Sequence, residues 1–390
     1  RTRTAYHWLK KGNNLAPYTK YLAGDIPRKG FYALVPKEIL DSVLNYEISE
    51  ESLPAIFKDI DSLLGGEKLD LIVGGPPCQA YSIAGRSRSE CKMVGDKRNY
   101  LYRLYAEFLK KYQPKYFVFE NVLGLLSARD EDGSLHFDNM RALFKKCGYA
   151  TDFRILNASD YGVLQNRKRI ILIGFHGEKA DFYPQIPVIK DAHKVGELFC
   201  DLPSIKAGEG VITPVKTTHY TGKYLFSARI KEYDEEPVTF HQARPNTAQD
   251  LEIYRIVVDT WNKSKTRVTY TDLPERLRTH NNTKSFLDRF KVVAGNLPYA
   301  QTVVAHISRD GHYFIHPDIK QNRSITPREA ARIQTFPDNY FFESVTGRPS
   351  RTLAYKQIGN AVPVCLSYHI AHALLARFTG GDKNAEESNT

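Results

Sequence analysis

The sequence predicts an α/β fold in which a sheet carries helices on both faces, joined to a second domain of irregular structure. Three features of its 390 residues support this prediction. Short apolar segments typical of buried strands alternate with segments that have helical spacing. A Gly-Gly-Pro-Pro turn at 74–77 follows the first strand segment. Between about 180 and 300 the alternation stops, which indicates a separate domain.

Four apolar segments are expected to form the sheet. They lie at residues 69–73, 116–119, 153–156 and 169–173. Helical spacing appears between them, at 100–111 and 140–147. Strands that alternate with helices usually run parallel, so we expect a mostly parallel sheet with both faces covered.

The two ends of the chain are expected to be helical. Residues 1–48 are polar and contain few glycines. Thr326 and Pro327 should begin a helix, with Pro at its first position, and 364–378 should form a last amphipathic helix. The tail from Gly380 is polar and expected to be loose. We therefore divide the chain into a main domain at 1–182, a second domain at 183–312, and a return to the main domain at 313–390.

The charge balance favours a polyanionic partner. Lys and Arg number 55 against 44 Asp and Glu, a formal net charge of +11. Between 261 and 291, eight Lys or Arg accompany three Asp or Glu, which indicates a nucleic-acid-binding patch or an ordinary solvated surface. No apolar run approaches the ~18 residues of a membrane span. The five cysteines lack CxxC spacing, so we expect a reducing cytosol, no disulfide framework and no metal site.

Two residues at predicted strand ends could carry chemistry. Cys78 follows the first strand, at the edge where ligands bind open α/β sheets. Its sulfur would be a nucleophile as thiolate; the alternative is a small packing residue. Glu120 ends the second strand, where partial burial would let it share a proton with a ring nitrogen. The alternative for Glu120 is a helix N-cap.

Two further motifs bear polar groups. Gln165, Arg167 and Arg169 alternate before the fourth strand, which would place them on one side of an extended segment. Their guanidinium groups suit phosphate and carbonyl recognition, unless this is an ordinary basic loop. The segment 357–363 is expected to be a turn entering a helix, whose backbone donors could hold a polar ligand.

The motifs are far more specific in combination than singly. In chain order they are Pro76-Pro77-Cys78-Gln79, Glu120-Asn121-Val122, Gln165-x-Arg167-x-Arg169, Arg323-Ser324-Ile325-Thr326-Pro327-Arg328-Glu329-Ala330-Ala331-Arg332 and Gln357-Ile358-Gly359-Asn360. This set resembles the cytosine-5 DNA methyltransferases, especially those of bacterial restriction-modification systems. The likeness covers about 55–180 and 300–378. It implies a Rossmann-like S-adenosylmethionine-dependent methyltransferase sheet and a smaller target-recognition domain at 183–312.

The resemblance also implies roles for four catalytic residues. Cys78 would attack C6 of a flipped-out cytosine, and Glu120 would hold N3 and the exocyclic amine. Arg169 would contact the base carbonyl, and Arg167 would help to fix phosphate and the catalytic groups. Addition of the thiolate makes C5 enamine-like, so that C5 can take a methyl group; loss of the C5 proton and of the thiolate then restores the ring.

Further residues match family positions around the two ligands. Those implied for the cofactor S-adenosylmethionine are Asp59, Ile60, Gly75, Pro77, Leu101, Asn360 and Val362. Those implied for double-stranded DNA are Gln79, Ser82, Arg86, Arg88, Gln165 and Thr302. By the same resemblance we expect a cytoplasmic, nucleoid-associated bacterial enzyme that acts as a monomer on DNA, beside a companion restriction endonuclease.

The sequence departs from the family pattern in two places, and alternatives stay open. The first, Leu123 where the family often has Pro, is expected to be tolerated, so the alternatives rest on the second. The Phe-x-Gly-x-Gly turn that cradles the methionine part of the cofactor is not found upstream of Leu69. We expect about 40–90 residues to precede Arg1, or a partner chain to supply them. The alternatives are a tRNA cytosine-5 methyltransferase, whose Cys-Phe-Thr signature is not seen in 180–300, and a catalytically silent DNA-binding homologue.

Overall fold

The computed structural model describes residues 1–76, 100–130, 132–189, 192–281, 286–344 and 346–379. These residues form two compact units. The large unit contains Arg1–Asp41, Ala158–Arg167 and Val188–His369. The sheet unit contains Ser42–Asn157, Lys168–Pro187 and the described residues from Ile370 onward. The predicted division into domains at 1–182, 183–312 and 313–390 stays a prediction. The large unit, however, groups the N-terminal helices and most of 313–390 with the irregular region.

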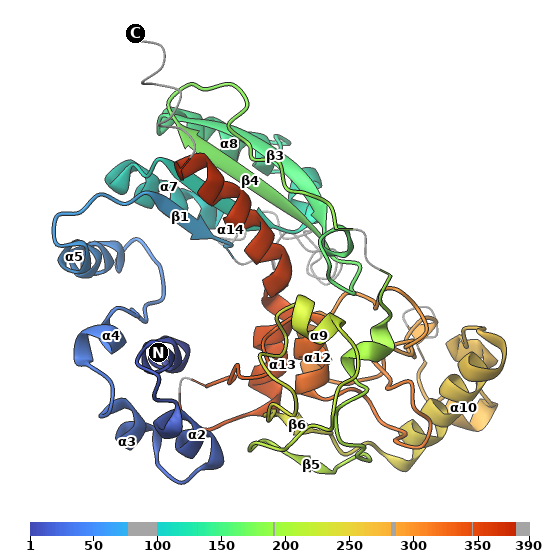
Figure 1. Ribbon diagram of the computed structural model, residues 1–390. Helices are drawn as coiled ribbons and strands as arrows, with labels where there is room; N and C mark the ends of the chain where they lie inside the picture. The colour runs from blue at the N-terminus through green and yellow to red at the C-terminus, as the bar shows by residue number, and fades with distance from the viewer. Residues whose placement is uncertain (77–99, 131, 190–191, 282–285, 345, 380–390) are drawn as a thin grey trace. The chain divides into compact units, whose positions relative to one another are not determined.

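The sheet unit is built on four strands, shown in Figure 1. They are ordered β1 (Leu71–Gly74), β2 (Tyr116–Asn121), β4 (Lys168–His176) and β3 (Tyr149–Asn157). All four predicted strands are present. Only β1 and β2 pair in parallel, whereas β4 is antiparallel to both β2 and β3. The expectation of a mostly parallel sheet is therefore wrong for the described strands. The link at 158–167 contains one short 3-10 turn and no crossover helix, which a parallel return would need.

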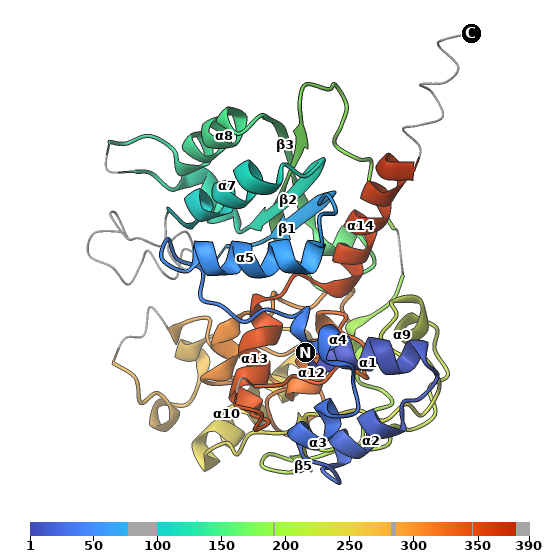
Figure 2. The ribbon, with the colours of Figure 1, turned by 90° about the vertical axis from the view of Figure 1, so that its left-hand side faces the viewer.

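Helices pack on the sheet as predicted. α7 (Leu101–Tyr112) and α8 (His136–Lys146) share an apolar core with β2 and β4. Figure 2 shows them together with α5 (Leu53–Leu64), which contacts α7 through Phe57 and Phe108 at a ring distance of 5.1 Å. α14 (Val364–Thr379) packs on the sheet through its C-terminal residues. The ring centres of Phe378 and Tyr116 lie 5.2 Å apart.

The large unit begins with four short helices, so the helical character predicted for the N-terminal residues is confirmed. These are α1 (Thr2–Lys11), α2 (Ala16–Ala23), α3 (Arg28–Tyr32) and α4 (Lys37–Asp41). Their aromatic core joins Tyr6, Tyr18, Tyr21 and Phe31, with Phe341 packed against it. The N-terminal helices are therefore anchored to the segment that contains Phe341.

Short elements fill the rest of the large unit. They are a two-stranded ladder of β5 (Gly210–Val211) and β6 (His241–Gln242), α9 (Tyr224–Ser227), α10 (Ala248–Ser264), α12 (Pro327–Ile333) and α13 (Arg351–Asn360). In the part of the chain that the structure describes, 3-10 turns form at Leu123–Ser127, Ala158–Asp160, Val195–Leu198, Tyr270–Asp272, Glu275–Leu277 and Ala305–Ser308. α12 begins as predicted: Thr326 accepts a bond from the Glu329 backbone, and the Glu329 carboxylate accepts one from Thr326 N at 2.7 Å.

One described stretch, Arg351–Thr379, has the length and hydropathy of a membrane-spanning helix. The stretch is divided at 361–363 into α13 and α14. Tyr355, Ile358 and Leu366 are fully buried in it. We therefore interpret it as two helices whose apolar residues serve the protein core.

Candidate functional site

Glu120 and Arg169 form an ion pair at one end of the sheet. They project from neighbouring antiparallel strands, with Glu120 opposite Ile171 in the ladder. Arg169 Nε donates to Glu120 Oε1 at 2.8 Å. Both side chains are partly accessible, 13% exposed for Arg169 and 21% for Glu120. The pair is therefore held in place while a polar edge remains open to a ligand. Glu120 lies inside a strand, so the N-cap alternative does not hold.

The end of β1 lies against this pair. A Cβ atom built on Gly75 would stand 2.8 Å from Glu120 Oε2. Asn121 Nδ2 donates to Pro76 O at 3.3 Å, and Asn121 Oδ1 accepts a bond from Val122 N at 2.9 Å. Asn121 thus ties the turn after β1 to the strand that carries Glu120. Six predicted site residues lie outside the described part of the chain, namely Pro77, Cys78, Gln79, Ser82, Arg86 and Arg88.

Replacing Gly75 with Ala should impair the site without unfolding the protein. The new methyl group would meet the Glu120 carboxylate, which Arg169 already holds in place. A displacement of about 1 Å at a reacting group can cost about 10²-fold in rate. For the methyl transfer that the sequence resemblance implies, we expect that loss in kcat, measured by methyl incorporation into DNA. Gly30→Ala is the control, because its Cβ would meet only Pro27 at 3.6 Å. Unchanged turnover in Gly75→Ala would contradict the assignment.

Gln165 and Arg167 lie in the large unit, and their hydrogen bonds go to groups of the protein itself, including the Gln334 side chain. Gln165 is fully buried; its Nε2 donates to Ile333 O at 3.1 Å, and its Oε1 accepts from Val303 N at 2.9 Å. Arg167 is 1% exposed and donates to Val303 O, Gly359 O and Ala361 O at 2.6, 3.0 and 2.8 Å. The predicted DNA contact of Gln165 is therefore wrong, because no surface of its amide is accessible.

These hydrogen bonds join three segments of the large unit, namely 164–167, 300–303 and the end of α13. We call this connected set the frame. The Thr302 hydroxyl donates to Asn166 O, and Ala300 N donates to Leu164 O at 2.9 Å. Gln334, which sequence reasoning did not single out, donates from Nε2 to Ile358 O at 2.7 Å. Its position two residues after the Arg323–Arg332 motif was the available signal. The frame fixes the 300–303 segment against the end of α13.

The segment 357–363 differs from the prediction. Gln357 to Asn360 are the last residues of α13, not a turn, and the turn follows at 361–363. Asn360 is exposed and Val362 is half-buried, so both are accessible to a ligand. Val364 N, at the start of α14, donates to Gln334 O at 3.1 Å and is not a free donor.

The remaining predicted cofactor residues lie in the sheet unit. Leu101 is the first residue of α7 and is half-buried. Asp59 and Ile60 lie within α5. The Asp59 carboxylate accepts a hydrogen bond from the Tyr46 hydroxyl at 2.6 Å, so one of its oxygens is engaged by the protein itself.

The basic segment 261–291 is largely paired within the protein. Five of its cations contact carboxylates: Lys263 with Asp259, Arg267 and Lys291 with Asp288, Arg276 with Glu252, and Arg289 with Asp310. Its positive excess is therefore partly neutralised. This arrangement favours the solvated-surface alternative for much of the segment.

Comparisons with known proteins agree on one family. The model of C-5 cytosine-specific DNA methylases matches residues 45–376. The type II methyltransferase M.Bpa9945I of Bacillus paralicheniformis is 37% identical, over 96% of this chain and 90% of that protein. M.DdeI of Desulfomicrobium norvegicum is 30% identical, over 84% of this chain and 79% of that protein. A crystal structure described as a DNA modification methyltransferase encoded within an Escherichia coli prophage has a TM-score of 0.55. It is 22% identical and covers 86% of this chain and 84% of that one, which supports the fold.

Proposed function

The chain belongs to the family of C-5 cytosine-specific DNA methylases, and from this premise we propose that Cys78, Glu120 and Arg169 form its catalytic centre. The enzyme is a DNA (cytosine-5-)-methyltransferase of the type II kind, the modification activity of restriction-modification systems. The single observation that carries the proposal is the 2.8 Å pair of Arg169 and Glu120 beside the end of β1.

Each proposed catalytic group has a distinct task. The Cys78 thiolate adds to C6 of the cytosine, which raises electron density at C5. The Glu120 carboxyl group holds N3 and the exocyclic amine, and Arg169 donates to the base carbonyl while orienting Glu120. Because the target atom is hidden in a duplex, the base must leave the stack to reach these groups.

Arg167 is proposed to act on the site indirectly. Its three bonds to backbone carbonyls and its burial replace the predicted contact with phosphate. It holds the segment that carries Thr302, and we keep Thr302 as a candidate DNA contact because its side chain is half-buried. Arg167 is thus a positioning residue in this proposal.

The cofactor implied by the family is S-adenosylmethionine, which supplies the methyl group when bound. The residues after β1 fit such a ligand, since Gly75 carries no side chain where a Cβ would touch Glu120. In the sheet unit, Gly75, Leu101 and the Asp59-Ile60 pair are proposed to hold it, with Pro77 from the sequence match. Asn360 and Val362 are proposed cofactor contacts from the sequence match alone.

Duplex DNA is the proposed substrate, because the matching family model describes a DNA methylase and not a tRNA enzyme. We propose that the recognition domain at 183–312 reads the target sequence and that the ranges 1–182 and 313–390 form the catalytic domain. Monomeric action on DNA, nucleoid association in the cytoplasm and a companion endonuclease complete the proposal. Gln79, Ser82, Arg86 and Arg88 are proposed DNA contacts from the sequence match alone.

Trapping on modified DNA tests the catalytic assignment. A duplex that contains 5-fluorocytosine at the target should become covalently attached to the enzyme, because fluorine at C5 cannot leave as a proton. Replacing Cys78 with Ser should abolish both the adduct and methyl transfer while DNA affinity changes little. Bisulfite mapping of treated plasmid DNA identifies the target for the trap.

Three outcomes would count against this function. An adduct that survives in Cys78→Ser would reject Cys78 as the nucleophile. Methylation of tRNA but not of DNA would favour the tRNA alternative. DNA binding by the wild-type chain with neither adduct nor methylation, with S-adenosylmethionine present, would favour the silent homologue.

A further inference from the structure

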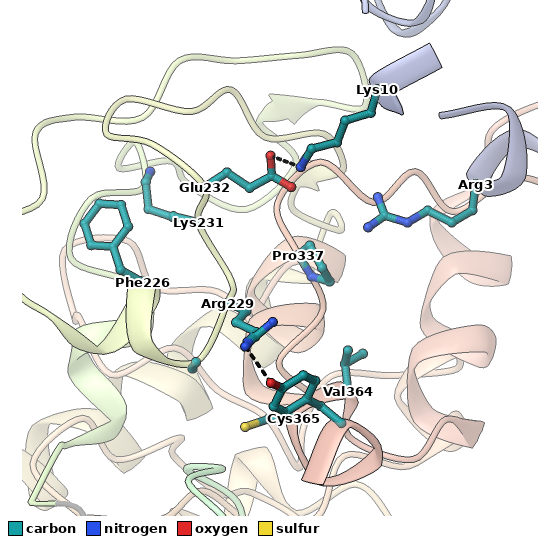
Figure 3. A pocket seen from close by; sticks show the side chains of 11 residues that line it. Arg3, Lys10, Phe226, Arg229, Lys231, Glu232, Pro337, Val364 and Cys365 are labelled. Carbon is teal, nitrogen blue, oxygen red and sulfur yellow. Dashed lines mark hydrogen bonds and ion pairs between the residues drawn. The ribbon is translucent and has the colours of Figure 1, made fainter. Parts of the chain in front are cut away.

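The large unit contains a basic pocket that the methyl-transfer proposal does not use. The pocket has a volume of about 510 Å³, within the range of small-molecule sites. Figure 3 shows Arg3 and Lys10 of α1 on one side and Arg229, from the turn after α9, on another. All lining residues belong to the large unit.

Two of its cations lack a negative partner. Lys10 pairs with Glu232 at 2.6 Å, so these two charges offset each other. Arg3 donates to the neutral Asn339 Oδ1 at 2.6 Å, and Arg229 donates to the Tyr368 hydroxyl at 2.8 Å. Among the described residues, no carboxylate forms an ion pair with Arg3 or Arg229. The pocket therefore presents a net positive charge to a ligand.

Arg229 occupies a left-handed backbone position that an arginine does not favour. Arg229 has φ of +58°, directly after the cap residue of α9. Gly or Asn normally occupies such a left-handed position, and other residues are strained there. The turn is closed by a hydrogen bond from Ile230 N to Leu225 O at 2.8 Å. This backbone bond does not depend on which side chain residue 229 carries. The turn itself does not require an arginine, whose guanidinium instead contacts Tyr368 at the pocket.

The rest of the lining is suited to a flat ring. Phe226 is 37% exposed, and Val364 and Pro337 add apolar surface. The Arg229 guanidinium lies 3.9 Å from the centre of the Tyr368 ring, which fixes its direction. Burial raises the pKa of the Cys365 thiol to about 11, so at neutral pH the sulfur adds no negative charge. Lys231 turns away and binds Asp201 at 2.7 Å.

We propose that this pocket binds a nucleotide, with its phosphate between Arg3 and Arg229 and its base against Phe226. A phosphate group suits two guanidinium groups, which can each donate two hydrogen bonds. The nucleotide can be free in solution or part of a DNA strand, since both present the same chemistry. The proposal does not depend on the catalytic assignment above.

Calorimetric titration of the full chain with adenosine monophosphate tests the site. S-adenosylmethionine is kept in excess so that adenine does not enter the cofactor site. We expect adenosine monophosphate to bind, and adenosine, which lacks the phosphate, to bind at least tenfold more weakly. Arg229→Asn should also weaken binding at least tenfold. Asn keeps the left-handed turn, so the thermal unfolding midpoint should not fall.

Lys20→Gln is the matched control, because it removes one exposed positive charge of the same unit outside the pocket. It should bind within twofold of the wild type. Displacement of the nucleotide by duplex DNA would assign the site to a DNA strand, and no displacement would assign it to a free nucleotide; both support the pocket. Three results would overturn it: no binding at millimolar concentration, equal binding of adenosine, or unchanged affinity in Arg229→Asn.

Discussion

Replacing Glu120 with Gln should lower the rate of methyl transfer by about 10²–10⁴-fold, the range of one positioned acid–base group. Gln keeps the shape of the side chain but can neither form the ion pair with Arg169 nor exchange a proton with N3 of the base. Single-turnover methyl incorporation isolates the chemical step. DNA affinity should change little, because the effect belongs to the transition state and not to ground-state binding.

The matched control for this experiment is Glu107→Gln. Glu107 also belongs to the sheet unit and pairs with Lys110 at 2.6 Å, but on the surface of α7. It should retain wild-type turnover and a wild-type unfolding midpoint. A Glu120→Gln enzyme with more than a tenth of wild-type activity would remove Glu120 from the catalytic centre.

The positions of the strands could be predicted, but not the directions of all of them. Short apolar segments typical of buried strands predicted the positions of β1, β2, β3 and β4 to within a few residues. Their alternation with helices predicted parallel pairing, and this is correct for β1 and β2. The link from β3 to β4, residues 158–167, is part of the large unit and contains no crossover helix. Its place in that unit depends on contacts distant in sequence, so local periodicity carries no sign of it.

The motif around Arg167 shows the same limit at the level of side chains. Alternate spacing placed Gln165, Arg167 and Arg169 on one side of an extended segment. The strand begins only at Lys168, so Arg169 pairs with Glu120 while Arg167 and Gln165 are buried in the other unit. Their partners, such as Val303 and Gly359, are more than 100 residues away in sequence. Spacing identified polar residues of importance but could not separate ligand contacts from internal bonds.

Helix α10 was missed for a related reason. The 180–300 region shows weak hydrophobic periodicity, and α10 buries only Ile253, Tyr254, Val257 and Val258 of its 17 residues. The residues at its start could have predicted a helix, because Thr247 and Asp250 form a capping box. A local cap, rather than a long apolar stripe, marked this helix.

Replacing Arg332 with Met should destabilise the large unit by about 3–5 kcal/mol, as expected when one partner of a buried ion pair is removed. Arg332 is fully buried, and its Nε and Nη2 donate to Asp338 at 2.9 and 2.6 Å. The same guanidinium binds Asp201 from 131 residues away in sequence, and Lys231 completes the group with a 2.7 Å bond to Asp201. Without Arg332, Asp338 would keep, among the described residues, only Arg328, at 3.9 Å, as a nearby cation, and Met can replace neither of the two hydrogen bonds that Arg332 donates to it.

Urea unfolding, followed by circular dichroism, measures this loss. Arg332→Lys should fall between Met and the wild type, since one ammonium keeps the charge but cannot form paired bonds to both carboxylates. The control is Arg276→Met, which removes an exposed arginine whose Nη1 donates to Glu252 at 2.7 Å, and should leave the midpoint nearly unchanged. If Arg332→Met unfolded at the same urea concentration as Arg276→Met, the buried network would not stabilise the fold. In that case the buried network would act by selecting one arrangement of the segments around α12, because the two carboxylates and Lys231 come from three separate parts of the chain.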